Sequence, residues 1–283
     1  MIIRNALTVD VEDYFHVSAF SGSIDQQDWG SHPLRVDDNT RRLLDIFDEY
    51  NVKATFFVLG WVAERTGSLI REIADRGHEV ACHGYSHQLV YNQTPDVFKG
   101  ETIRSKKILE DIIQSGVRGY RAASYSITDR SVWALDILAE AGFDYDSSIF
   151  PIRHDRYGMP DAPKSPYRMK TPAGHDLIEF PLSTAKIFQY RLPVAGGGYF
   201  RLYPYWLSKA GLNQINSQKK PFIFYLHPWE IDPGQPRINA SWFARFRHFN
   251  NLEKCETRLR ALLNDFSFDT VESVLQKQGL IQA

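Results

Sequence analysis

An apolar run that ends in three carboxylates constrains this chain most strongly. Ile2, Ile3 and residues 6–9 are apolar or β-branched, which is typical of a buried strand. Asp10, Glu12 and Asp13 follow at once. Carboxylates packed together at the end of a buried strand repel one another and are costly to desolvate, so they need a positive partner. We expect that partner to be a metal ion.

Two histidines further along the chain supply ligands of the complementary kind. His83 and His87 follow a predicted strand at residues 78–82, and the intervening Gly84 favours a loop over a helix. Two imidazoles and one carboxylate suit Zn²⁺, with Co²⁺ or Ni²⁺ as alternatives, and leave open positions for water and substrate. The spacing alone would also fit two unrelated surface histidines. The clustered acids favour the metal site.

Strand and helix patterns alternate along the chain, which indicates an α/β fold with a largely parallel sheet or barrel. In such folds the functional residues gather at the carboxyl ends of the strands. Most candidate residues follow predicted strands, which lie at residues 2–10, 54–60, 78–82, 119–122, 143–148, 177–182 and 222–226. We therefore expect them to converge on one site.

The carboxylates after the first strand divide between two roles. Asp10 and Glu12 alternate with Val11, so on a strand both point to the same side. One can bind a metal while the other acts as a general base. Asp13 competes with Glu12 for the ligand role. A solvated acidic turn is the structural alternative.

Two further polar residues follow later strands. His227 comes after five apolar residues and is a candidate general acid, with a buried structural histidine as the alternative. Arg121 is a candidate partner that orients the base, with a surface salt bridge as the alternative. Tyr14, Tyr125 and Trp229 are candidate sugar-stacking residues in a chain with 13% aromatic residues, although each could equally belong to the core.

Composition and charge exclude several classes of partner. The chain has 283 residues and a net charge of -1, which gives no field that favours nucleic acid or an anionic membrane. No apolar run reaches the roughly 20 residues that span a bilayer. The first residues are interrupted too early by Arg4 and Asn5 for a signal peptide. Cys82 and Cys255 are expected to be free thiols, and we expect a cytoplasmic protein.

At these positions the chain resembles the polysaccharide deacetylases of carbohydrate esterase family 4, the NodB-homology proteins. The resemblance rests on residues 8–13, His83 with His87, Arg121, residues 146–148 and Leu226 with His227. It implies a distorted (β/α)7 barrel with a C-terminal helical extension, in one domain over residues 1–283, with the barrel at about 5–230 and the extension at about 231–283. It implies Asp10 as base, His227 as acid, Arg121 as the residue that orients the base, and a metal held by Glu12, His83 and His87.

The chain departs from the family pattern at three points. Gly84 replaces a hydroxyl residue that steadies the histidine loop in relatives. Ala123 and Ser124 replace a proline and a tyrosine after Arg121, although the backbone N–H of Ser124 can still hold an oxyanion. Leucine directly precedes His227. Ser124 therefore joins Tyr14, Tyr125 and Trp229 as a predicted substrate-binding residue.

Other segments resemble a subfamily found in exopolysaccharide loci linked to exosortase and PEP-CTERM sorting. They are residues 10–16, 154–158, 196–201, 227–230 and 245–248. The resemblance implies a metal-dependent hydrolase that removes acetyl groups from N-acetylated amino sugars of a polysaccharide or its precursor. A small-amide hydrolase similar to allantoinase, and an inactive carbohydrate-binding protein, remain alternatives. The sugar, the native metal and the oligomeric state are left open.

Overall fold

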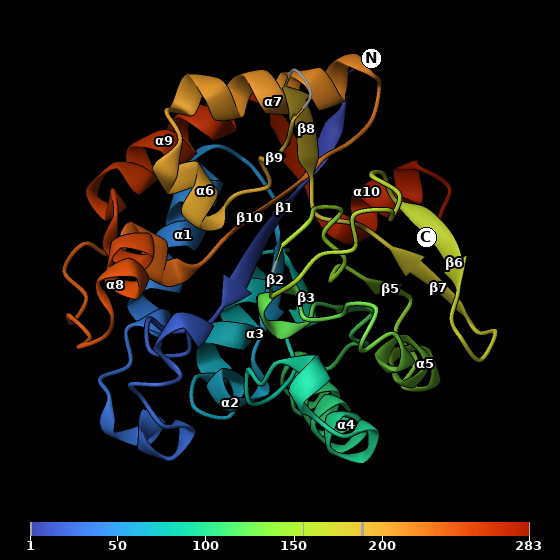
Figure 1. Ribbon diagram of the computed structural model, residues 1–283, viewed down its shortest axis with the longest axis horizontal. Helices are drawn as coiled ribbons and strands as arrows, with labels where there is room; N and C mark the ends of the chain where they lie inside the picture. The colour runs from blue at the N-terminus through green and yellow to red at the C-terminus, as the bar shows by residue number, and fades with distance from the viewer. Residues whose placement is uncertain (1, 155, 188–189, 283) are drawn as a thin grey trace.

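A mostly parallel nine-stranded sheet forms the centre of the fold in the computed structural model, which describes residues 2–154, 156–187 and 190–282 (Figure 1). The strand order is β10-β1-β2-β3-β4-β5-β7-β6, with β11 beside β1. Only β6 runs antiparallel to its neighbour in this sheet. The strands are β1 (Arg4–Val11), β2 (Thr55–Val58), β3 (Glu79–Cys82), β4 (Gly119–Tyr120), β5 (Tyr145–Asp146), β6 (Tyr167–Lys170), β7 (Asp176–Glu179) and β10 (Ile223–Leu226).

Helices follow most of these strands and cover the outside of the sheet (Figure 1). Successive strand residues point to opposite faces, so Phe56 packs in the outer core beneath the helices while Phe57 packs in the barrel interior. The helices are α1 (Val36–Glu49), α2 (Gly60–Ala63), α3 (Gly67–Asp75), α4 (Pro95–Ile113), α5 (Trp133–Glu140), α6 (Gly197–Leu202) and α7 (Tyr205–Ser217). The predicted α/β class with a distorted barrel is confirmed.

The barrel closes irregularly between β7 and β10. The hairpin of β8 (Thr184–Ile187) and β9 (Tyr190–Pro193) lies in this part of the chain, and Tyr225 N–H donates to Ala195 O over 2.7 Å. At Gly196, whose φ is 130°, a Cβ would lie 1.9 Å from Tyr225 O. Gly196 is therefore a point where two backbones touch, and α6 begins at the next residue.

The C-terminal segment contains more than one helix. It forms α8 (Trp242–Phe249) and α9 (Leu252–Asp265), which are separated because Asn251 adopts a left-handed conformation with φ 53°. β11 (Ser267–Asp269) then pairs with the start of β1, and α10 (Val271–Lys277) follows. A boundary near residue 230 stays a prediction. None of the described helices is long and apolar enough to cross a membrane.

A partly buried carboxyl group connects α10 to the barrel. Glu79 accepts hydrogen bonds from the hydroxyls of Thr55 (2.5 Å) and Tyr145 (2.6 Å) and from the backbone N–H of Glu272 (3.1 Å). Burial outweighs these donors and raises the pKa of Glu79 from 4.5 to about 7. The folded state therefore binds this proton more tightly than the unfolded chain does.

We expect Glu79→Gln to flatten the pH dependence of stability. The contribution of a carboxyl whose folded pKa is raised is fully present below pH 4.5 and is lost as the pH rises to about 7. The wild type should lose roughly 2 kcal/mol more than Glu79→Gln between pH 4.5 and 7.5. Urea unfolding at both pH values measures this, with exposed Glu253→Gln as control. Equal losses in the wild type and Glu79→Gln would contradict the assignment.

Candidate active site

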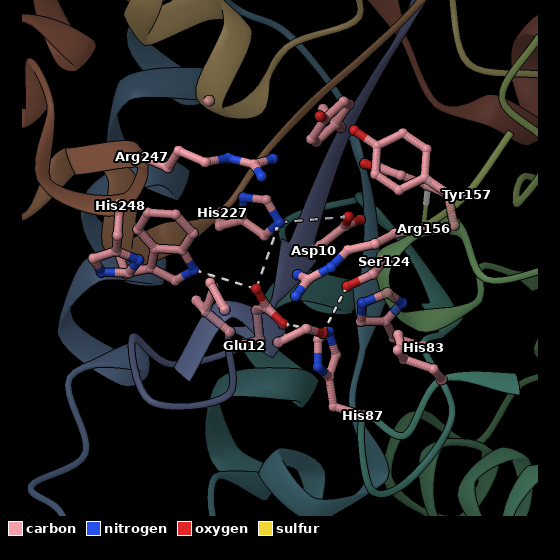
Figure 2. A pocket seen from close by; sticks show the side chains of 18 of the residues that line it. Asp10, Glu12, His83, His87, Ser124, Arg156, Tyr157, His227, Arg247 and His248 are labelled. Carbon is pink, nitrogen blue, oxygen red and sulfur yellow. Dashed lines mark hydrogen bonds and ion pairs between the residues drawn. The ribbon is translucent and has the colours of Figure 1, made fainter. Parts of the chain in front are cut away.

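The carboxyl ends of β1, β3 and β10 and the turn after β4 surround one cavity (Figure 2). Parallel strands end at the same edge of the barrel, so residues far apart in the sequence meet there. The cavity is lined by all three predicted metal ligands and by the predicted acid and base. These are Asp10, Glu12, His83, His87 and His227.

Glu12, His83 and His87 form a group that fits a metal ion. One donor atom from each lies within 4.8 Å of the others. His83 Nδ1 lies 2.8 Å from Arg121 O, a hydrogen bond that fixes the ring and leaves Nε2 for an ion. His87 Nε2 lies 2.7 Å from Glu12 Oε2, yet this buried oxygen has no hydrogen-bond donor among the described residues. A buried carboxylate oxygen without a donor, facing two imidazoles, is suited to a divalent cation.

Charge and burial keep these donors in the forms that a metal requires. Burial lowers the pKa of His83 to about 4, so its imidazole is neutral near pH 7. Burial opposes ionisation of Glu12, but His87, His227 and His83 outweigh it and hold the pKa of Glu12 well below its usual range. A neutral imidazole and an ionised carboxylate are both metal ligands without further loss of protons.

Asp13, the reserve ligand, faces away from this group. Its carboxylate accepts the backbone N–H groups of Tyr14 (2.9 Å), Arg35 (2.7 Å) and Val36 (2.9 Å). It therefore satisfies the free donors at the start of α1, which no local side chain caps. The structure thus places Glu12, and not Asp13, beside the histidines.

The histidine loop is held without the hydroxyl residue that Gly84 replaces. The carbonyl of Gly84 accepts a hydrogen bond from Ser105 Oγ (2.9 Å) and another from the backbone N–H of Gly60 (2.8 Å). Ser86 Oγ donates to Glu101 over 2.6 Å. Contacts to α2 and α4 therefore fix the loop between His83 and His87.

Asp10 forms a buried ion pair with Arg121 across the barrel interior. Arg121 Nη1 donates to Asp10 Oδ1 over 2.7 Å and to Thr8 Oγ1 over 2.8 Å. Its other nitrogens donate to Ser147 O (3.1 Å) and Ser147 Oγ (3.0 Å). The guanidinium also lies 4.1 Å from the ring centre of Phe57. Because Arg121 is fully buried, the surface salt bridge considered as an alternative is excluded.

His227 stands opposite this pair and contacts Glu230, which in turn contacts Arg201; the sequence analysis missed both residues. Its Nδ1 lies 3.0 Å from Glu230 Oε2, and Arg201 Nε donates to Glu230 Oε1 over 2.6 Å. His227 Nε2 lies 3.9 Å from Asp10 Oδ2 and 3.5 Å from Glu12 Oε1 (Figure 2). Burial lowers the pKa of His227, but Glu12, Glu230 and Asp10 together raise it to about 9. The three-residue spacing from His227 to Glu230, at a turn that begins with Pro228, was the available signal.

Trp229 does not offer the free ring that was predicted for sugar stacking. It lies in η5 (Pro228–Ile231), stacked between His227 at 4.9 Å and His248 at 4.2 Å between ring centres. Its Nε1 lies 3.3 Å from Glu12 Oε1, to which it donates. Trp229 therefore lines the cavity but holds the side chains of His227 and Glu12.

Tyr14 is a further correction. It is fully buried and packs edge-on against Phe15 and His32, and it is not among the residues that line the cavity. β1 ends at Val11 and Tyr14 lies in the turn that follows, so the strand alternation that relates Asp10 to Glu12 does not extend to Tyr14.

Ser124 and Tyr125 do line the cavity. Both lie in η4 (Ala123–Tyr125) in left-handed conformations, with φ of 50° and 55°. Ser124 Oγ lies 2.8 Å from Ser18 Oγ. The ring of Tyr125 packs edge-on against Tyr225 and Tyr157.

Comparison with known families agrees with this site. Residues 27–145 match the family described as polysaccharide deacetylase, and residues 147–276 match a domain of unknown function, DUF3473. The segment at residues 27–145 therefore matches the polysaccharide deacetylases, the family that the sequence motifs resemble. The predicted acid His227 lies in the second of these segments.

One curated relative is the peptidoglycan-N-acetylglucosamine deacetylase of Bacillus cereus. It is 35% identical over 104 residues, which cover 35% of this chain and 36% of the relative. The match thus spans about a third of that protein.

Two solved structures share the fold. One, from Mycobacterium smegmatis and assigned to the polysaccharide deacetylases, has a TM-score of 0.64 at 23% identity and covers 99% of this chain and 92% of its own. The other, the PuuE allantoinase, has a TM-score of 0.60 at 13% identity and covers 99% of this chain and 91% of its own. At these identities the likeness establishes the fold.

We expect His87→Ala to weaken Zn²⁺ binding at least about 100-fold, because it removes one of three protein ligands. Titration calorimetry on chelator-treated protein measures the affinity, and the wild type should bind one ion. Exposed His175→Ala is the matched control and should bind as the wild type does. Asp13→Asn should lower the unfolding temperature but keep the metal affinity. Unchanged Zn²⁺ affinity in His87→Ala would contradict the assigned ligands.

Proposed function

We propose that this protein is a metal-dependent hydrolase that removes acetyl groups from N-acetylated amino sugars of a polysaccharide or its precursor. The juxtaposition of the Glu12, His83 and His87 group with the Asp10–Arg121 pair carries the proposal. The family match and the name of the Bacillus cereus relative support an acetylated amino sugar as substrate. The resemblance to exopolysaccharide-locus proteins supports a role in exopolysaccharide synthesis.

The donor set fits a divalent metal, and Zn²⁺ is our choice. Glu12 Oε2 is buried without a donor among the described residues, and His83 is neutral and oriented by Arg121 O. When bound there, the metal would polarise the acetyl carbonyl and acidify a water molecule. Trp229 keeps the second oxygen of Glu12 in place.

Asp10 is the proposed general base. Arg121 holds one carboxylate oxygen of Asp10 at a distance of 2.7 Å. Asp10 also lines the cavity, as Glu12 does. Arg121 stabilises the ionised carboxylate, which can then take a proton from the attacking water. The backbone N–H of Ser124, at the cavity wall, is the proposed donor to the oxyanion.

His227 is the proposed general acid. Its raised pKa of about 9 keeps the ring protonated near pH 7, so it can donate a proton to the departing amine. Glu230 binds the opposite ring nitrogen and directs Nε2 into the cavity. Proton donation at this point makes the sugar amine a competent leaving group.

We expect Asp10→Asn to lower kcat for acetate release roughly 10²–10⁴-fold, because the amide cannot accept the proton. Acetate released from N-acetylglucosamine oligomers by Zn²⁺-loaded protein is the readout. Zn²⁺ affinity should stay at the wild-type value, which separates loss of the base from loss of the metal. Wild-type turnover in Asp10→Asn would remove Asp10 from the mechanism, and hydrolysis of allantoin but of no acetylated sugar would favour the small-amide alternative.

We expect Glu230→Gln to move the alkaline limb of the kcat profile to lower pH. Glu230 raises the pKa of His227 by its charge and hydrogen bond, so its neutral replacement lets the acid deprotonate at lower pH. The measurement is kcat from pH 6 to 10 in both proteins. An unmoved limb would show that His227 is not the titrating acid.

A further inference from the structure

Two arginines reach the cavity from opposite sides without an acidic partner. Arg156 and Arg247 both line it, and neither makes an ion pair with any residue that the structure describes. Figure 2 shows Arg247 above His227 and Arg156 beside Ser124. The acidic residues of the site already have other partners, because Asp10 pairs with Arg121 and Glu12 lies 2.7 Å from His87.

The segment that carries Arg156 is shaped to present it. At Gly158 φ is 111°, and a Cβ would lie 2.2 Å from Ile152 O, so the chain turns tightly just after Arg156. The neighbouring Tyr157 stacks on Phe150 with an angle of 6° between the ring planes. Its hydroxyl oxygen lies 3.3 Å from the hydroxyl oxygen of Tyr199. Arg156 therefore extends from a packed turn at the wall of the cavity.

The backbone beneath Arg247 is anchored as well. Buried Arg201 donates to Arg247 O over 3.2 Å and to His248 O over 2.7 Å, which ties the end of α8 to the site. Arg247 and Tyr157 both line the cavity, and the Arg247 guanidinium lies 5.5 Å from the ring centre of Phe243. Residues 233–252 hold three arginines and no acidic residue, so nothing in that segment neutralises Arg247.

We propose that Arg156 and Arg247 bind an anionic group, a carboxylate or a phosphate, on the saccharide next to the acetylated amino sugar. Guanidinium groups bind both anions through paired charge-assisted hydrogen bonds. Both side chains are exposed in the free protein, and a neutral polymer seated in the cavity would displace water from them without pairing their charges. The inference rests on the proposed function only in taking an acetylated amino sugar as the substrate. Binding of the anion can be measured without turnover.

The test compares three trisaccharides of N-acetylglucosamine by calorimetry with Zn²⁺-loaded Asp10→Asn protein. One is neutral, one has a neighbouring uronic acid, and one carries a terminal phosphate. We expect at least one anionic ligand to bind at least about tenfold more tightly than the neutral one, and the preferred ligand names the anion. The preference should shrink as salt rises from 50 to 500 mM.

Variants show whether the preference comes from these two arginines. Adding Arg156→Gln or Arg247→Gln should reduce the ratio of anionic to neutral affinity to about twofold or less, while Zn²⁺ binding reports an intact site. Arg153→Gln and Arg245→Gln are matched controls on the same turn and the same helix, since both are exposed and line no part of the cavity. A neutral ligand that binds as well as both anionic ones, or an unchanged ratio in both variants, overturns the inference. Absence of acetate release in the wild type would count against the proposed function alone.

Discussion

The buried guanidinium of Arg121 is the constraint on which the site depends. It neutralises Asp10 and donates to Ser147 just after β5, and the backbone carbonyl of Arg121 orients His83. A buried ion pair gains little over water when complete, but losing one partner leaves a buried charge that costs about 3–5 kcal/mol. The base, a metal ligand and two strands of the barrel are therefore fixed by one residue, and changes at Arg121 should disturb structure and chemistry together.

A second network connects the opposite wall of the cavity to the C-terminal part of the chain. His227 binds Glu230, Glu230 binds Arg201, and Arg201 holds the carbonyls at the end of α8. Trp229 fills the space between His227 and His248 and reaches Glu12. The residues after the deacetylase-family match thus complete the cavity begun by the strands before and within it.

The sequence could predict the residues that gather here because strand ends of a parallel barrel meet at one edge. All six residues lie at or shortly after the end of a strand, and all are found around or beneath one cavity: Asp10, Glu12, His83, His87, Arg121 and His227. Strand periodicity placed Asp10 and Glu12 on one face, and the family resemblance favoured Glu12 over Asp13 as the metal ligand. The cap that Asp13 provides for α1 joins segments more than 20 residues apart, and no local pattern indicated it.

Roles that depend on exposure could not be predicted from residue type. Tyr14 and Trp229 are aromatic in the way that a sugar-binding residue is, but one is core and the other is sandwiched between two histidines. Glu230 and Arg201 were missed because their importance comes from a contact between η5 and α6. The break between α8 and α9 depends on the left-handed backbone conformation of Asn251. The helical pattern of the residues on both sides gave no indication of it.

Acetate release by chelator-treated protein, with and without added Zn²⁺, tests the central claim most directly. N-acetylglucosamine oligomers, with and without anionic neighbours, serve as substrates. The account predicts no release from the metal-free protein and recovery of release with one equivalent of Zn²⁺. Release that persists without metal, or a Zn²⁺-loaded protein that binds these saccharides and releases no acetate, would contradict it.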